Sequence, residues 1–186
     1  MVRIFPLLVV MLAFGSVSRA AEIDGIRLPD IKQVDGRILR LNGYGLRAWS
    51  VLRIPIYVAG LYLEHPNRDA ETIIRSSEVK LLIFRFEHEI GADRAREAWR
   101  TGLTNNCAAP CQLDSADMER FLSEIPTMHD GDSFELRFGA GVATITLNGR
   151  LLGRVEKEAF ADAMLRSFLG PRPGAPEIKQ ALLSGG

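Results

Sequence analysis

The chain has 186 residues, and its 23 basic side chains balance its 23 acidic ones, so the formal net charge is zero. Hydrophobic residues make up 47% and charged residues 25%, a composition typical of one folded globular domain and not of a disordered chain. With a pI near 6.8 and no dense basic run, the charge does not support nucleic-acid binding or attraction to an anionic membrane surface.

Residues 1–20 have the features of a cleaved secretory signal. Arg3 supplies the positive charge, an apolar run follows it, and Ser18 and Ala20 are the small residues expected before a cleavage site. The run is short for a membrane-spanning helix, which needs roughly 17–25 apolar residues. An N-terminal anchor and a plain buried helix are the alternatives. We expect residues 21–186 to form one secreted domain without a stable membrane anchor, periplasmic if the host is Gram-negative.

The first half of this domain is typical of β-structure. A short strand is expected at Glu22–Leu28, and a second strand at Arg37–Leu41 leads into Asn42-Gly43, a dipeptide typical of hairpin turns. Two further strands are expected at Tyr44–Arg53 and Pro55–Leu63, with Pro55 at the start of its strand, where a missing N–H donor is tolerated.

The middle of the chain mixes helices with one strong strand. Asp69 is placed to cap a short helix that ends at Arg75, and Val79–Glu87 gives the strongest strand signal in the chain. A helix follows, in which the apolar residues at helical spacing are Ala92, Ala95, Trp99 and Leu103. Another helix opens at Ser115.

The last third predicts a strand meander and a helical tail. Strands are expected at Phe134–Phe138, Val142–Leu147 and Arg150–Val155, and the short glycine-rich loops between them favour antiparallel hairpins. Helices are expected at Glu158–Leu169 and from Pro176 to Leu183. Strands segregated from helices in this way predict an α+β fold, an antiparallel sheet covered by a layer of helices.

The two cysteines, Cys107 and Cys111, are separated by three residues after an expected helix. In an oxidising compartment this spacing favours a local disulfide that fixes the helix end, worth about 2 kcal/mol on the chain-entropy model. Free thiols and a metal or redox site are the alternatives. A zinc site would need two further ligands, for which His88 and His129 are the candidates.

The usual catalytic signatures are absent from the sequence, which has no G-x-S-x-G, no H-E-x-x-H and no P-loop. Gly43-Tyr44-Gly45 and Gly139-Ala140-Gly141 are typical of turns and not of a dinucleotide fingerprint. His65, His88 and His129 fall at the edges of expected elements, where an exposed or hydrogen-bonded histidine is the simplest interpretation. We therefore expect no cofactor and no metal.

Arg47 is the most informative polar residue. Strand alternation places Arg47, Trp49 and Val51 on one side of their strand. A guanidinium keeps its charge and pairs well with planar carboxylates, so a desolvated Arg47 requires an anion. That anion is either a protein carboxylate or the head group of a bound acid.

Asn42–Arg47 (Asn-Gly-Tyr-Gly-Leu-Arg), followed by Tyr57–Glu64 (Tyr-Val-Ala-Gly-Leu-Tyr-Leu-Glu), resembles the start of the chalcone isomerase-like superfamily, in particular its secreted bacterial branch. Phe160–Gly170 and Pro176–Leu182 are similar to the family's last two helices. The resemblance implies an open-faced β-sandwich, in which a large antiparallel sheet is packed by helices.

In plant chalcone isomerases, a cleft between sheet and helices carries out an intramolecular ring closure. Arg47 matches the family's strand arginine, whereas Tyr57 stands where the enzymes have a threonine. The enzymes also carry a tyrosine, a lysine and an asparagine on one helix, and the corresponding positions here fall near Arg94, Glu97 and Thr101. Because Glu97 reverses the charge of the lysine, the resemblance implies that ring closure is lost.

Related plastid members bind fatty acids through an arginine and a tyrosine, and Arg47 and Tyr57 would form such a pair. The leading hypothesis is therefore a secreted, non-enzymatic protein that binds a small amphipathic acid, such as a fatty acid. The candidate ligand-binding residues are Arg47, Trp49, Tyr57, Glu97 and Thr101, with Leu61 and Phe84 as apolar lining.

Two alternatives remain. One is an intramolecular lyase or isomerase with an unidentified substrate, in which Arg47, Tyr57 and Glu97 are the polar groups of a rebuilt site. The other is a structural or interaction module with a filled cleft, in which Arg47 pairs with a protein carboxylate. The oligomeric state and the orientation of Arg94, Arg96 and Arg100 are left open.

Overall fold

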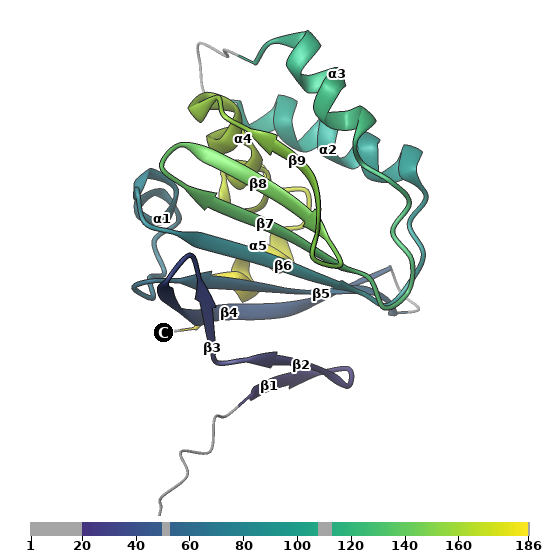
Figure 1. The fold of residues 1–186 in the computed structure, drawn as a ribbon. Coiled ribbons are helices and arrows are strands. Elements are labelled where there is room, and N and C mark those ends of the chain that lie inside the picture. Colours follow the sequence, from purple (N-terminus) through teal and green to yellow (C-terminus); the bar gives the residue numbers. More distant parts are fainter. Residues whose placement is uncertain (1–19, 50–52, 108–112, 186) are drawn as a thin grey trace, which may run out of the picture.

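A computed structural model describes residues 20–49, 53–107 and 113–185. Seven antiparallel strands form one curled sheet, in which each strand pairs with its neighbours in sequence (Figure 1). These strands are β3 (Ile31–Val34), β4 (Arg37–Trp49), β5 (Ile54–Leu63), β6 (Lys80–Phe86), β7 (Ser133–Gly139), β8 (Val142–Leu147) and β9 (Arg150–Val155). A separate hairpin of β1 (Ala20–Ile23) and β2 (Ile26–Pro29) precedes them.

Two-residue turns set the register of the hairpins. Asp24-Gly25, Asp35-Gly36, Ala140-Gly141 and Asn148-Gly149 all have positive φ at both residues. This is the backbone that a tight hairpin needs to match the twist of its strands, and glycine, asparagine and aspartate adopt it most readily.

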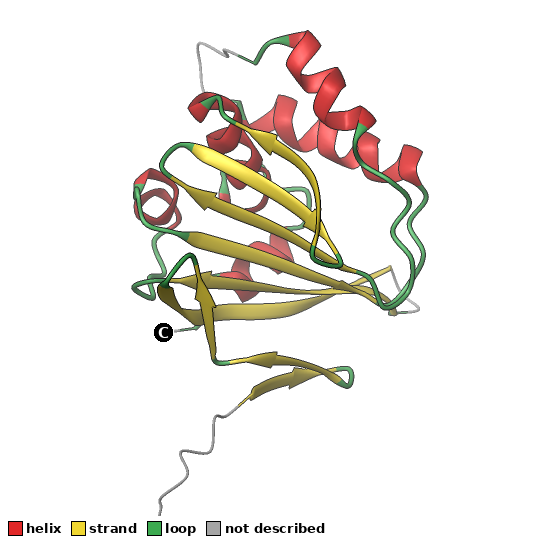
Figure 2. Cartoon of the chain, in the orientation of Figure 1, coloured by secondary structure: helices red, strands yellow, loops and turns green. Residues whose placement is uncertain are grey.

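The helices gather at one face and one end of the sheet (Figure 2). They are α1 (Ala70–Arg75), α2 (Ala92–Asn106), α3 (Ser115–Ser123), α4 (Glu158–Leu169) and α5 (Pro176–Leu182). Asp69 caps α1, as expected, because its carboxylate accepts a hydrogen bond of 2.7 Å from the backbone N–H of Thr72. Asp114 caps α3 in the same way.

The sheet has a core on each face. Ala59, Leu61 and Leu63 of β5 point to the larger core, under the helices, as their shared parity predicts. Val58 and Tyr62 point to a smaller core on the opposite face, where Leu28 of the β1–β2 hairpin packs against them. Since both faces of β5 are buried, this strand is the centre of the fold.

Helix α5 packs directly on β4, at a place where the strand has little side-chain bulk. A Cβ atom at Gly43 would lie 2.3 Å from the carbonyl oxygen of Ala181, and one at Gly45 would lie 2.4 Å from the Ala181 Cβ. The buried Asn42 side chain donates to the carbonyl oxygen of Leu182, at 2.8 Å. The expected turn at Asn42-Gly43 is therefore wrong: these residues form a bulge inside one long strand, against which a helix rests.

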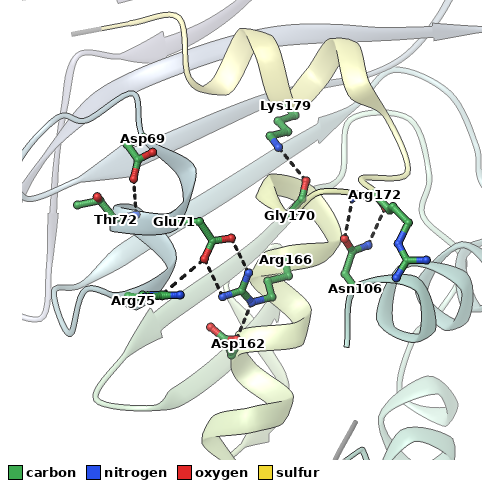
Figure 3. A network of polar contacts seen from close by, with 10 residues as sticks. All are labelled: Asp69, Glu71, Thr72, Arg75, Asn106, Asp162, Arg166, Gly170, Arg172 and Lys179. Carbon is green, nitrogen blue, oxygen red and sulfur yellow. Dashed lines mark hydrogen bonds and ion pairs between the residues drawn. The ribbon is translucent and has the colours of Figure 1, made fainter. Parts of the chain in front are cut away.

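Polar contacts hold the helical layer together (Figure 3). The Arg166 side chain of α4 bonds Asp162 on its own helix at 2.8 Å and Glu71 of α1 at 2.7 Å. Asn106, at the end of α2, donates to the carbonyl oxygen of Arg172 at 2.7 Å and accepts a hydrogen bond from the Arg172 N–H at 3.0 Å. The Arg166 contacts join α4 to α1, and the Asn106 contacts fix the chain between α4 and α5, which forms part of the site described below.

The expected α+β class is confirmed, as is the antiparallel sheet covered by helices. The bounds expected for β8, β9 and α4 agree with the structure. The expected leading strand is two strands, because Asp24-Gly25 turns the chain back on itself. Strand β3 was not expected.

The described residues leave two sequence predictions open. The secretory signal lies almost wholly in residues 1–19, and Cys111 lies in residues 108–112, both outside the described part of the chain. The signal and the Cys107–Cys111 disulfide therefore stay predictions. None of the helices in the described ranges combines the length and the apolar character that a membrane crossing requires.

Candidate binding cavity

A cavity of about 260 Å³ lies between the helix-facing side of the sheet and the helices α2, α4 and α5. Most of its lining is apolar, and seven of the side chains are aromatic. The lining residues are Arg47, Trp49, Ile56, Tyr57, Phe84, Phe86, Ile90, Arg94, Ala95, Ala98, Trp99, Gly102, Met128, Phe134, Ser167, Phe168, Gly174, Ala175 and Ile178.

Arg47 and Tyr57 lie side by side in this cavity. They are direct cross-strand partners on β4 and β5, so their side chains leave the same face of the sheet. Burial raises the pKa of the Tyr57 phenol to about 12, although the positive charge of Arg47 acts in the opposite direction. Tyr57 therefore remains a neutral hydrogen-bonding group across the physiological pH range.

Arg47 already has a protein carboxylate as its partner. Its Nη1 donates to Oε1 of Glu177, in the first turn of α5, and the Arg47 side chain is 32% exposed. Within the described residues, no other hydrogen bond joins the Arg47 guanidinium to the protein.

Trp49 presents its ring to a second arginine. The guanidinium of Arg94, on α2, lies 4.0 Å from the centroid of the Trp49 ring, a cation–π contact, and His88 meets the same ring edge-on at 5.9 Å. Arg94 has no ion-pair partner among the described residues. Two guanidinium groups therefore lie at this end of the cavity, and one carboxylate faces them.

Aromatic rings close the rest of the cavity. Phe168 of α4 lies 5.0 Å from Phe84 of β6 and 5.4 Å from Trp99 of α2, measured between ring centroids. Phe84 also contacts the Tyr57 ring edge-on at 5.3 Å. This ring cluster joins the sheet to the helices and forms an apolar wall of the cavity.

Helix α2 turns a different face to the cavity than the family resemblance implies. Glu97 and Thr101 are exposed and do not line it, and the Thr101 hydroxyl donates to Glu97 at 3.3 Å on the outer surface. Ala95, Ala98 and Trp99 face the cavity instead, because they lie on the apolar face of the helix. The expected placement of Glu97 and Thr101 in the site is therefore wrong.

The remaining candidates divide between cavity, core and surface. Arg96 donates to the backbone carbonyl of Ile125 at 3.0 Å, and Arg100 bonds Glu119 on α3 at 3.2 Å. Neither arginine lines the cavity. Leu61, expected in the lining, is fully buried in the core behind it, whereas Phe84 lines the cavity as expected.

Sequence reasoning missed Glu177 and Phe168 as members of the site. The helical spacing of Phe160, Met164 and Phe168 indicated an apolar face, but not that its last residue ends in a cavity. No local signal connects Glu177 with a strand 130 residues earlier.

The lining can bind an anion and an apolar tail. No aspartate, glutamate or histidine belongs to the lining among the described residues, and the carboxylate at its edge, that of Glu177, is paired with Arg47. Tyr57 is held neutral, and the Ser167 hydroxyl donates to the Ala163 carbonyl inside α4, at 2.9 Å. Arg47 therefore meets the expectations of two hypotheses at once. The cavity beside it is expected of a ligand-binding site, and its pairing with Glu177 is expected of a structural module.

Two larger hollows lie elsewhere on the protein. One of about 420 Å³ lies among α3, β9 and the start of α4, and one of about 690 Å³ lies among α1, α4 and the β7–β8 turn. Several of their charged side chains already form ion pairs, such as Lys157 with Asp117 and Arg166 with Glu71. Neither contains a candidate from the sequence.

The protein is thus of the α+β class, with a cavity between its sheet and its helices. The sheet is curled and antiparallel, and the cavity is mostly apolar and contains arginine side chains. A family model described as chalcone isomerase-like matches residues 20–184, so the chain belongs to the chalcone isomerase-like family. A search of curated protein sequences returned no match.

Among solved structures, the fold is similar to that of the Arabidopsis thaliana fatty-acid binding protein AtFAP1, with a TM-score of 0.72. The two share 15% sequence identity over 89% of this chain and 96% of that one. At this identity the likeness shows the fold.

Proposed function

We propose that this chain is a secreted, non-enzymatic chalcone isomerase-like protein of the bacterial branch that binds a small amphipathic acid in the cavity between sheet and helices. The observation that carries the proposal is the half-buried Arg47, with Arg94 near it, at one end of a mostly apolar cavity. The name of the structural neighbour, a fatty-acid binding protein, supports a fatty acid as the class of ligand.

The head of such a ligand would be held by charge and by a hydroxyl. A carboxylate beside Arg47 receives charge-assisted hydrogen bonds, and the neutral Tyr57 phenol is a further donor close by. Arg94 adds a second positive charge at the same end.

The size of the cavity limits the tail. A methylene group occupies about the volume of a water molecule, roughly 30 Å³, so a cavity of about 260 Å³ accepts a tail of about eight or nine carbons. The volume therefore favours a medium-chain acid. Each methylene that enters the cavity contributes about 0.8 kcal/mol, or roughly a fourfold gain in affinity.

Calorimetric titration with hexanoate, octanoate, dodecanoate and hexadecanoate tests this proposal. We expect affinity to rise up to octanoate and then to level off or fall. Arg47→Gln should weaken octanoate binding by roughly 10- to 100-fold, because a hydrogen bond to a charged group is worth about 1.5–3 kcal/mol. Arg100→Gln, on the outer face of α2, is the matched control and should leave binding unchanged.

Native mass spectrometry of protein purified from cells supplies a second test, since a bound acid should co-purify. The binding proposal fails if no acid co-purifies and none binds with a Kd below about 1 mM. N-terminal sequencing of the exported protein tests secretion separately, with cleavage after Ala20 as the expected result.

A further inference from the structure

We propose that Glu177 is an internal counter-ion that occupies Arg47 when the cavity is empty and that the carboxylate of the ligand displaces. This inference rests on the proposed function and concerns the regulation of the same site. It accounts for the presence of both a cavity and a protein carboxylate beside one arginine.

Arg47 needs a partner at all times because it cannot lose its charge. Its side chain is two-thirds covered, by Tyr57 among others, and an unpaired guanidinium in such a place carries a large desolvation cost. Glu177 meets that need in the unliganded protein. A bound acid would meet it equally well, so the two carboxylates compete for the same donor.

Glu177 can leave Arg47 without any movement of the backbone. Its side chain is 50% exposed, so water takes up its charge when it swings outward, and a rotamer change of this kind takes picoseconds to nanoseconds. Helix α5 itself stays in place, because Lys179 bonds the Gly170 carbonyl at 2.8 Å and Asn42 bonds the Leu182 carbonyl. The exchange is therefore confined to one side chain.

The charges at this end of the cavity favour exchange. Arg47 and Arg94 carry two positive charges against the single negative charge of Glu177. Once Glu177 has swung into water, an incoming carboxylate takes its place beside the two guanidinium groups, whereas a neutral ligand such as an alcohol leaves the ion pair intact. The site should therefore discriminate between an acid and an alcohol of the same length.

Titration of the Glu177→Gln variant with octanoate and with 1-octanol tests the inference. Removal of the competitor should tighten octanoate binding by about two- to fivefold, the upper part of the range expected for an exposed ion pair. Octanol binding should be unchanged. Asp93→Asn is the matched control: it removes an exposed carboxylate next to Arg94 that does not touch Arg47, and it should have less than a twofold effect.

A spectroscopic readout separates displacement from a general change in charge. The ¹³C resonance of the Glu177 carboxyl group in the wild-type protein should shift when octanoate is added, and should not shift with octanol. If octanoate binds the wild type but Glu177→Gln binds it no more tightly, or Asp93→Asn tightens it equally, displacement is refuted while the binding function stands. If neither protein binds any acid, the proposed function itself fails.

Discussion

The most direct test of the structure replaces Asn42, which holds α5 on the sheet. Its side chain is fully buried, donates to the Leu182 carbonyl at 2.8 Å and accepts a hydrogen bond from the Asn67 N–H at 2.7 Å. Asn42→Ala leaves both backbone groups without this partner. An unsatisfied buried polar group costs about 1–3 kcal/mol, and water can reach Asn67, which is only partly buried.

We therefore expect Asn42→Ala to lower the free energy of unfolding by about 3 kcal/mol, which corresponds to a fall in Tm of roughly 6–12 °C for a chain of this length. Urea denaturation followed by circular dichroism measures the first quantity, and calorimetry the second. Hydrogen exchange should show the greatest loss of amide protection in α5, because that helix is released first.

Asn67→Ala is the matched control. The Asn67 side chain also accepts a backbone hydrogen bond, from Asp69 at 2.8 Å, but on the surface, where water replaces it. Its loss should cost less than about 1 kcal/mol. The reasoning is refuted if Asn42→Ala is no more destabilising than Asn67→Ala, or if α5 keeps its protection.

Three further predictions follow from the site and its surroundings. Phe168→Ala should lengthen the cavity and shift the preferred acid from octanoate towards dodecanoate in the same titration, whereas Phe160→Ala, buried outside the cavity, should lower stability without this shift. Burial and the neighbouring Asp24 carboxylate raise the pKa of Glu87 to about 7. Between about pH 4.5 and pH 7 the Glu87 carboxyl group is therefore ionised in the unfolded chain but still protonated in the folded protein, so stability should fall as pH rises through this range. Glu87→Gln should remove that fall, about 1 kcal/mol after solvent screening, in melts at about pH 5 and pH 8. Because the pKa of Tyr57 is about 12, the protein should lose stability between about pH 10 and 12, and Tyr57→Phe should lose less, as melts at about pH 9 and pH 11 would show.

Sequence patterns predicted the parts of the fold that local chemistry determines. Asn148-Gly149 forms a hairpin turn because its two residues readily adopt positive φ, and strands β8 and β9 follow from it. Asn42-Gly43 has the same local signature, but it lies within β4. There the deciding interaction is α5, which returns to the strand 140 residues later, and no local pattern contains that information.

In the site, too, local sequence patterns predicted some positions, and tertiary packing determined the others. Strand alternation placed Arg47 and Trp49 on the cavity face, and helical periodicity placed Ala95 and Trp99 on the inner face of α2. Of the helix positions taken from the family resemblance, Arg94 lines the cavity but Glu97 and Thr101 fell on the outer face, since a shift of one or two residues along a helix rotates the side chain by about 100–200°. The partner of Arg47 depends on tertiary packing alone.

The late position of α5 in the sequence has a consequence for how the protein is made. Neighbouring strands of the sheet follow one another in the chain, with α1 between β5 and β6 and with α2 and α3 between β6 and β7, so the sheet can grow strand by strand as the ribosome extends the chain. The groove on β4 at Gly43 and Gly45 stays uncovered until residues 176–182 have emerged. Helix α5 is therefore the last element that a nascent chain can add, and it completes both the lining and the charge balance of the site.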